Sequence, residues 1–257
     1  ILRIYADGSI DLIGSTTSQS VYFQGATGYN NGVTVMNDIC EELYSNESLN
    51  AKARNIRDED FEYWMTEKGL EKLLSQGLGD VPYGHTQTYT VNKYYPSLYA
   101  QEKGSKIDSG LSGLTAGMDK EKGNTTGLER SQGGIAMGSQ EAVTSLTTTQ
   151  RGWNNGSGFL TEEFFGDGMF ALGDELSYWV ASRTVHCSEY YATFSLNDVY
   201  YKSYGNMGLF TSHGRDQSYA NEPGDHLRPV IQLPPDVEIR FSEGPNNINN
   251  MHRIQYK

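Results

Sequence analysis

The chain has 257 residues, enough for one large globular domain or two small ones, with 37% hydrophobic residues and a net charge of −12. An acidic surface repels phosphate backbones, so this charge argues against a nucleic-acid partner and is typical of a chain kept soluble by its charge. No apolar run approaches the roughly 20 residues that cross a bilayer, which argues against direct membrane insertion.

The N-terminal residues 2–12 predict a β-hairpin. Apolar residues recur at every second position in both arms, and Asp7 and Gly8 form a dipeptide typical of tight turns. A third short strand is expected at residues 20–24. Because the strand pattern begins at once, we interpret Ile1 as a processed or truncated end and expect an anchor or fibre region upstream.

Helical patterns follow this hairpin. Residues 28–32 predict a turn in which one of two asparagines caps a helix over residues 33–44. Residues 56–65 predict a second helix, with acidic residues at its start, where negative charge suits a helix N-terminus. The apolar stripe continues through residues 70–74 and stops at the glycines that follow.

The pattern changes between about residues 79 and 158, where Gly, Ser, Thr, Asn and Lys dominate. Strands are possible at residues 88–91 and 142–148, and residues 103–138 are typical of a long loop. This region could be a linker between two domains, but its flanks do not look like independent cores. We therefore expect a single domain over residues 1–257 with a loop-rich insertion at about 79–158.

Short strand patterns at regular intervals occupy the C-terminal part and suit a twisted antiparallel sheet. They cover residues 177–183, 192–196, 207–211, 227–233 and 237–241. The polar tail, residues 246–257, is expected at the periphery. We expect the N-terminal hairpin, the strand at 227–233 and the helix at 33–44 to share one core, with the chain termini near each other.

Tyrosine is unusually frequent, with 18 Tyr against 9 Phe, and six of them lie between Arg183 and Leu227. Tyrosine gives a recognition surface a large rigid contact area with a hydroxyl group. The alternative is that these rings pack in the core, but a consecutive pair such as Tyr200 and Tyr201 in a strand puts one ring on each face. We expect at least half of the six to be exposed on one face, with His186, His213 and Arg215.

Several stretches carry a resemblance to a known family. Residues 178–183 and the closing strand at 227–233, together with residues 24–33 and 94–103, resemble C-type-lectin-fold proteins, including the variable proteins diversified by retroelements in prophages and on the surfaces of Gram-positive gut bacteria. The resemblance implies an α+β, C-type-lectin-like (formylglycine-generating-enzyme-like) fold. It also implies a rigid scaffold whose exposed residues vary freely between copies.

The resemblance further implies where a ligand would bind. By position, the ligand-binding residues are Thr184, His186, Ser188, Glu189, Tyr190, Tyr191, Asp198, Tyr200, Tyr201, Ser203, Tyr204, Asn206, Thr211, His213, Arg215, Gln217 and Tyr219. One departure is that residues 221–226 look longer than is usual before the closing strand.

Catalytic and metal sites are not expected. Formylglycine-generating enzymes share the wider fold and use cysteine chemistry, but no nucleophile–base pair can be singled out here. The two cysteines belong to no Cys-x-x-Cys pair, and the five histidines show no paired spacing, so neither a zinc site nor a cofactor is expected. Cys40 and Cys187 could form one disulfide, or Cys40 could be a buried helix residue and Cys187 a lone thiol in a loop.

A calcium-dependent lectin is the sharper alternative. Glu222, Pro223 and Gly224 are similar to the Glu-Pro-Asn stretch of sugar-binding lectins, and Asn197 with Asp198 is similar to their Asn-Asp pair. Calcium needs six to eight oxygen ligands, and the glycine removes one of them. The alternative interpretation of residues 222–225 is a surface turn.

These observations predict a binding protein displayed outside the cell, on a virion tail or a bacterial surface. Its partner would be a protein or glycan receptor on a cell surface, and a homo-oligomer could form through an upstream region. A structural component of a tail, pilus or surface filament is a further possibility, and a remnant enzyme is the last.

Overall fold

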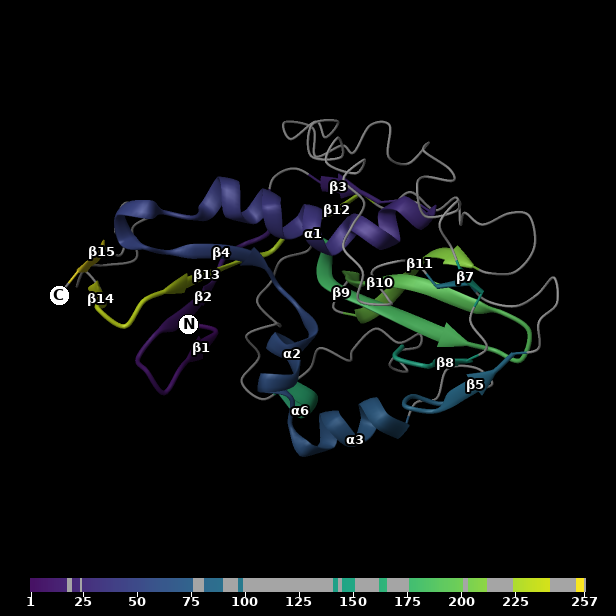
Figure 1. Cartoon of the computed structure of the whole chain (residues 1–257). Helices are drawn as coiled ribbons and strands as arrows, with labels where there is room; N and C mark the ends of the chain where they lie inside the picture. The colour runs from purple at the N-terminus through teal and green to yellow at the C-terminus, as the bar shows by residue number, and fades with distance from the viewer. Residues whose placement is uncertain are drawn as a thin grey trace.

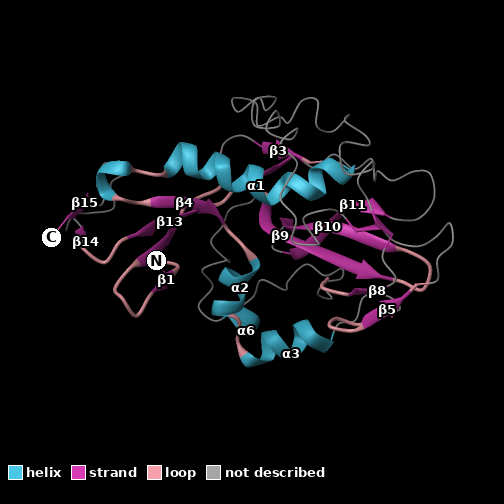
Figure 2. Cartoon of the chain, in the orientation of Figure 1, coloured by secondary structure: helices cyan, strands magenta, loops and turns pink. Residues whose placement is uncertain are grey.

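The structure, a computed structural model, describes residues 1–17, 20–23, 25–75, 81–89, 97–98, 141–142, 145–150, 162–165, 176–200, 203–211, 224–240 and 253–256. These residues form a mixed α+β structure with few helices and with antiparallel and mixed sheets (Figures 1 and 2). The helical segments are α1 (Gly25–Tyr44), the 3-10 helix η1 (Glu47–Leu49), α2 (Asp58–Trp64), α3 (Glu67–Ser75) and α6 (Glu162–Phe165).

A four-stranded antiparallel sheet joins the two ends of the chain. Its strand order is β1 (Arg3–Ile4), β2 (Ile10–Ile13), β13 (Pro229–Leu233) and β4 (Lys52–Asn55). The N-terminal hairpin is therefore confirmed, and its turn uses Gly8 at φ +89°, a conformation that favours glycine. Because β2 pairs with β13, residues more than two hundred positions apart in sequence lie side by side.

A five-stranded sheet contains the longest strands. Its order is β11 (Ser203–Thr211), β10 (Ala192–Tyr200), β9 (Tyr178–Cys187), β12 (Gly224–His226) and β3 (Ser20–Tyr22). Strands β9, β10 and β11 form an antiparallel meander, whereas β12 runs parallel to β9. Three two-stranded pairs complete the described strands: β5 (Thr86–Thr88) with β8 (Ser145–Thr147), β6 (Ser97–Leu98) with β7 (Glu141–Ala142), and β14 (Val237–Arg240) with β15 (Arg253–Tyr256).

Helix α1 runs along both large sheets, while α2, α3 and α6 lie on the opposite side (Figure 1). The main core lies beneath α1, where Tyr29 packs edge-on against Phe194 with ring centroids 5.2 Å apart. A second cluster joins Leu2, Phe61 and Val230 on the α2 side. The neighbour of Val230, Ile231, packs against the main cluster, so β13 links the two clusters as expected for a shared core.

The first helix begins earlier than predicted. The turn expected at residues 28–32 lies inside α1, which starts at Gly25. Gly32 serves packing instead: a Cβ placed there would lie 2.4 Å from Leu196 Cδ1, so a side chain at this position would force Leu196 to shift.

The second helical pattern divides into two helices. Met65 adopts an extended conformation between α2 and α3, and the Thr66 hydroxyl then accepts a hydrogen bond from Gly69 N at 3.1 Å. The continuous apolar stripe gave no signal of this break. The strand expected at residues 88–91 also starts earlier, at Thr86.

Both cysteines are free and buried, Cys40 in α1 and Cys187 at the end of β9, so the loop position expected for Cys187 is wrong. The loop expected at residues 103–138 lies outside the described residues. Within the described ranges, no helix has both the length and the apolar composition that crossing a membrane requires.

Candidate binding surface

Ser188 shapes the tight turn that joins β9 to β10. Its backbone N–H donates to Tyr191 O at 2.9 Å, and its hydroxyl donates to the same oxygen at 3.1 Å. The hydroxyl also accepts from Tyr190 N at 3.3 Å and from Tyr191 N at 3.2 Å. The Ser188 hydroxyl thus supplies the hydrogen-bond partners that these backbone groups need in a turn. Glu189 and Tyr190 are therefore held at its tip.

A buried tyrosine anchors this turn from below. Tyr89 is 6% exposed, and its hydroxyl donates to Tyr191 O at 3.1 Å. Burial first, and then the neighbouring Cys187 thiol, raises the pKa of Tyr89, so the hydroxyl stays protonated and remains a donor. Cys187 N donates in turn to Thr148 Oγ1 at 3.3 Å. The turn therefore rests on a rigid base.

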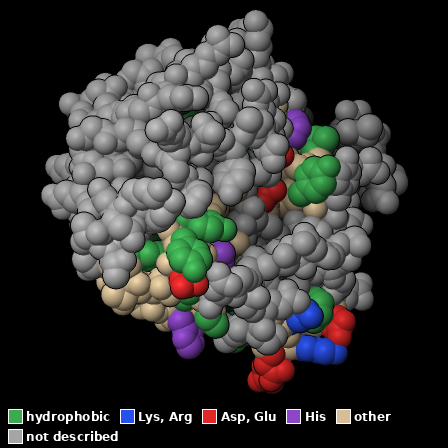
Figure 3. All heavy atoms as spheres, turned by 90° about the vertical axis from the view of Figure 1, so that its right-hand side faces the viewer, with side chains coloured by type: hydrophobic (Ala, Val, Ile, Leu, Met, Phe, Trp, Pro, Cys, Tyr) green, Lys and Arg blue, Asp and Glu red, His purple; other side chains and the backbone are tan. Residues whose placement is uncertain are grey.

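The tip of the turn presents an exposed aromatic ring. Tyr190 is 60% exposed and Glu189 is exposed beside it, whereas His186 and Tyr191 are half-buried. Figure 3 looks onto this side of the molecule, where hydrophobic, acidic and histidine side chains of the described residues gather at the surface. An aromatic ring with polar neighbours on a fixed turn suits contact with a partner.

Tyr200, a second exposed tyrosine among the described residues, lies at the far end of β10. It is 56% exposed and pairs with Ser203 where β10 turns into β11. A strand advances about 3.3 Å per residue, so roughly 30 Å separate the two ends of β10. Tyr190 and Tyr200 therefore lie at opposite ends of β10, and the expected grouping of the tyrosines on one face stays a prediction.

Three residues expected to contact a ligand are buried. Thr184, Ser188 and Asp198 are 3%, 4% and 4% exposed, so none of them offers its side chain to a partner. Thr184 and Asp198 point inward from strand interiors, and Ser188 is used by the turn. Consecutive residues from Phe194 to Val199 are all buried, so both faces of β10 are covered and a place in the variable stretch does not by itself put a side chain outside.

The other expected ligand-binding residues are not described in full. Ser203, Tyr204, Asn206 and Thr211 belong to β11, whose backbone pairs with β10. Tyr201, His213, Arg215, Gln217 and Tyr219 lie outside the described residues, so their roles remain predictions.

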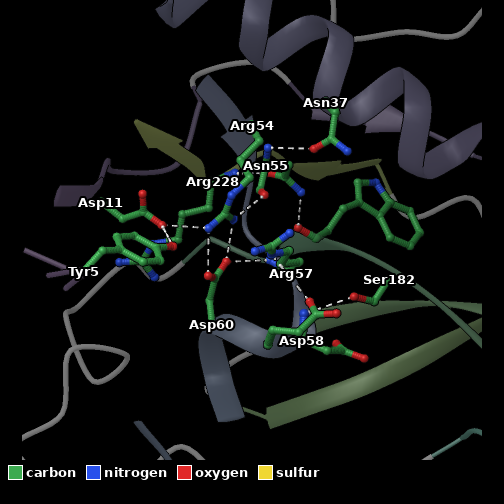
Figure 4. Close-up of polar contacts among 12 residues, drawn as sticks. Tyr5, Asp11, Asn37, Arg54, Asn55, Arg57, Asp58, Asp60, Ser182 and Arg228 are labelled. Atoms are coloured by element: carbon green, nitrogen blue, oxygen red, sulfur yellow. Dashed lines mark hydrogen bonds and ion pairs between the residues drawn. The ribbon is translucent and has the colours of Figure 1, made fainter. Parts of the chain in front are cut away.

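An arginine ties the four-stranded sheet to α2 (Figure 4). Arg54 donates from Nη1 to Asp60 Oδ2 at 2.6 Å and from Nη2 to Asp60 Oδ1 at 2.8 Å, in a bidentate pair. Its Nη2 also donates to Asp11 Oδ2 at 3.0 Å, and Tyr5 OH donates to the same oxygen at 2.9 Å. Burial alone would lower the pKa of Arg54, but the bond to Asp60 and the two carboxylate charges outweigh it and raise that pKa.

This network is not predicted by the sequence pattern. From the sequence, Asp60 is one of several acidic residues at a helix start, and nothing in the pattern pairs it with a particular cation. It does cap α2 by accepting from Arg57 N at 3.0 Å, but it also pairs with a cation from β4. The cation precedes Asp60 by six positions across a break in secondary structure, so periodicity gives no signal for the pair.

A second polar bridge links α2 to the five-stranded sheet. Asn197 Nδ2 donates to both carboxylate oxygens of Asp58 at 2.9 Å, and Asp58 N donates to Ser182 Oγ at 3.0 Å. Asn197 is 2% exposed. The amide therefore holds α2 against the sheet and faces away from the side on which α1 packs.

Two buried carboxyls, Asp198 and Asp225, face the opposite side. Each is 4% exposed, and Asp225 Oδ2 has no hydrogen-bond partner. Burial first, and then the Asp225 charge, raises the pKa of Asp198 to about 7, and burial raises the pKa of Asp225 to about 7. The Asp225 charge thus adds to the effect of burial on Asp198, whereas burial alone accounts for the shift of Asp225.

The thiols are poorly suited to catalysis. Burial raises the pKa of Cys40 to about 12, against a smaller lowering by Arg54, and burial also raises the pKa of Cys187. A thiol that stays protonated is a weak nucleophile. Among the residues that the structure describes, no three His, Cys, Asp or Glu side chains gather as a metal site would require.

Comparison of the chain with protein-family models, with curated proteins and with solved structures gave no match. The resemblance to C-type-lectin-fold proteins therefore rests on the sequence stretches quoted above.

Proposed function

We propose that this chain is a ligand- or receptor-binding protein with a C-type-lectin-like fold, displayed on a virion tail or a bacterial surface. One observation carries the proposal: the turn between β9 and β10 holds an exposed Tyr190 on a base built by Ser188 and the buried Tyr89. A rigid support with an exposed aromatic tip reduces the entropy lost on binding. The partner is a protein or a glycan on a cell surface.

The fold proposal has its own support. The N-terminal hairpin pairs with β13 near the C-terminal end of the chain, and one long helix packs against both large sheets. The meander β9–β10–β11 forms the longest strands and carries exposed tyrosines at its turns. Such a layout separates a stable scaffold from residues that can change without disturbing it.

We propose a binding role in preference to a catalytic one. The thiols that a formylglycine-generating enzyme would need are buried, and the pKa of each is raised. The polar groups bridging the sheets and α2 already bond to one another, which suits structural roles.

A calcium-dependent lectin is a second candidate, favoured by one observation. Asp198 and Asp225 come from the two stretches that are similar to calcium-binding lectin motifs, and their charges interact. However, Asn197 points away from Asp198 and holds Asp58, because successive residues of a strand face opposite sides. One cation could not be coordinated by the side chains of both Asn197 and Asp198, so a binding protein without calcium is the better proposal.

The test uses the whole chain against a printed array of glycans and against whole bacterial cells. We expect Tyr190→Ala to weaken binding roughly 30-fold if the ring is a hot spot, while stability changes by less than about 0.5 kcal/mol. Tyr63→Ala is the matched control, because Tyr63 is 49% exposed on α2, away from the turn.

Two results would contradict this proposal. The first is that the wild-type chain binds neither probe. The second is that Tyr190→Ala binds as well as Tyr63→Ala. If Tyr200→Ala alone weakens binding, the partner contacts the opposite end of β10 and the assignment to the Tyr190 turn is wrong.

A further inference from the structure

Glu189 and Tyr190 are the two central residues of the turn that joins β9 to β10. The hydrogen bond from Ser188 N to Tyr191 O closes the turn around them. Among the described residues other than glycine, Asn50 alone has a positive φ, so neither central residue adopts the left-handed conformation. Ser188 and the backbone hold the turn, while the side chains of Glu189 and Tyr190 are exposed to solvent.

The Glu189 carboxylate has no cationic partner among the described residues. The ion pairs of those residues lie at the four-stranded sheet and on α2, α3 and α6, and Glu189 belongs to none of them. An exposed carboxylate contributes little to stability even when it is paired. Its charge is therefore available to a group that approaches the tip of the turn from outside.

The end of the β9–β10 hairpin is poor in positive charge. From Tyr178 to Tyr200, Arg183 is the single lysine or arginine, and residues 81–89 and 145–150 contain neither. The Arg183 guanidinium lies 5.8 Å from the ring centre of Tyr29, a buried residue of α1. The chain as a whole has a net charge of −12. Such a surface attracts cationic groups and repels anionic ones.

An arginine side chain fits both groups at the tip. Its planar guanidinium stacks on the face of an aromatic ring and also pairs with a carboxylate. This chain already makes the first kind of contact elsewhere, because the Arg3 guanidinium lies 4.8 Å from the ring centre of Tyr5 and 4.5 Å from that of Tyr63. Arginine is also enriched at protein–protein interfaces.

A glycan satisfies the tip less well. A neutral sugar can stack on the Tyr190 ring, but it leaves the Glu189 charge without a partner. Sugars that carry carboxylate or sulfate groups are repelled by the same charge. The two residues together therefore favour a protein partner.

We propose that the partner is a protein with a basic surface, one arginine of which stacks on the Tyr190 ring and pairs with the Glu189 carboxylate. This inference rests on the proposed binding function and names the partner class for the same turn. Attraction between the acidic chain and a basic surface speeds their association, so binding weakens as the salt concentration rises.

Whole bacterial cells separate a protein partner from a glycan. Binding of the wild-type chain should be lost after proteinase K treatment of the cells and kept after periodate oxidation, which destroys the diols of glycans. Binding that survives proteinase K and is lost after periodate would overturn the protein partner. The proposed binding function would still stand if Tyr190→Ala weakened that binding, and a further loss in Glu189→Gln would assign the cation to an amino sugar.

A peptide library tests the arginine itself. The whole chain selects from phage-displayed, disulfide-closed random peptides, and peptides that bind Tyr190→Ala as well as wild type are set aside. The remaining peptides should contain arginine. Its replacement by citrulline, which keeps the shape and removes the charge, should weaken binding to wild type about five-fold and to Glu189→Gln less than about two-fold. Glu71→Gln, which removes an exposed charge from α3, should behave as wild type.

Two outcomes of the selection would overturn the inference. One is that no selected peptide depends on both Tyr190 and an arginine. The other is that citrulline weakens binding to Glu189→Gln as much as to wild type, because the arginine would then respond to the charge of the whole chain and not to Glu189.

Discussion

At the four-stranded sheet, Asp11 of β2 and Asp60 of α2 are buried beside Arg54 of β4, whereas in the five-stranded sheet Asp198 of β10 and Asp225 of β12 are buried with β9 between their strands. The first arrangement matches each acid to a donor at 3.0 Å or less. The second raises the pKa of both acids, while each arrangement leaves one oxygen without a partner, Asp11 Oδ1 in the first and Asp225 Oδ2 in the second. The comparison shows that the cost of burying a carboxylate depends on its neighbour more than on its depth.

The largest expected effect is at the centre of the four-stranded sheet. Arg54→Met removes the cation from two acids that are 3% exposed or less, so the chain should lose about 3–5 kcal/mol. Urea unfolding with an unchanged m-value measures this loss. Glu59→Gln is the control, because its ion pair with Arg57 is exposed and worth little. A loss no larger than that of the control would show that Arg54 does little to stabilise the two buried acids.

The bridge from α2 to the five-stranded sheet should give the next largest effect. Asn197→Ala removes two hydrogen bonds to the Asp58 carboxylate, and bonds to charged groups contribute more than neutral ones. We expect a loss of about 2–3 kcal/mol in urea unfolding. Ser182→Ala, which removes the acceptor for Asp58 N, should cost less. If Asn197→Ala and Ser182→Ala cost the same small amount, Asp58 is held by other contacts.

The packing of α1 over β10 tests the apolar side of the same sheet. Gly32→Ala puts a methyl group 2.4 Å from Leu196 Cδ1, and the strain should exceed the gain in helix propensity by about 1–2 kcal/mol. Leu196→Val should relieve part of this loss in the double variant. Thr34→Ala, at an exposed position of α1, is the control and should be neutral. An equally neutral Gly32→Ala would mean that Leu196 can move aside freely.

The smallest effect is expected at the β9–β10 turn. Ser188→Ala removes the hydroxyl that bonds three backbone groups, and the loss should be about 1 kcal/mol. Tyr89→Phe should cost a similar amount by removing its bond to Tyr191 O. Glu189→Gln at the exposed tip should change stability little. If Ser188→Ala and Glu189→Gln lower the free energy of unfolding equally, the Ser188 hydroxyl does not stabilise the turn.

The sequence predicted the N-terminal hairpin and most of the strands well. The hairpin has its turn at Asp7 and Gly8, and the strand patterns at 177–183, 192–196 and 227–233 all fall on observed strands. These patterns depend on alternation within a few residues, which local sequence records directly. The helix start and the break at Met65 were missed, because both depend on what the helix packs against.

For the candidate surface, sequence composition identified the tyrosine-rich segment but not which side chains point outward. Tyr190 and Tyr200 are exposed as expected, yet β10 places them at opposite ends. Thr184 and Asp198 belong to the same variable stretch and are buried. Both faces of β10 are covered, since Phe194 to Val199 are all buried, and residue types do not reveal whether one or both faces of a strand are covered.

By itself, the sequence determined the α+β character of this protein, its hairpin and the core-forming strands, because turn residues and apolar alternation act over short distances. Only the tertiary structure decided which charges meet. Arg54 finds Asp11 across β13, and the strands that bury Asp198 and Asp225 lie on either side of β9, arrangements for which sequence order gives no distance. Electrostatic energy depends on those distances and on burial, so the contrast between a matched ion pair and an acid pair arises only when the chain is folded.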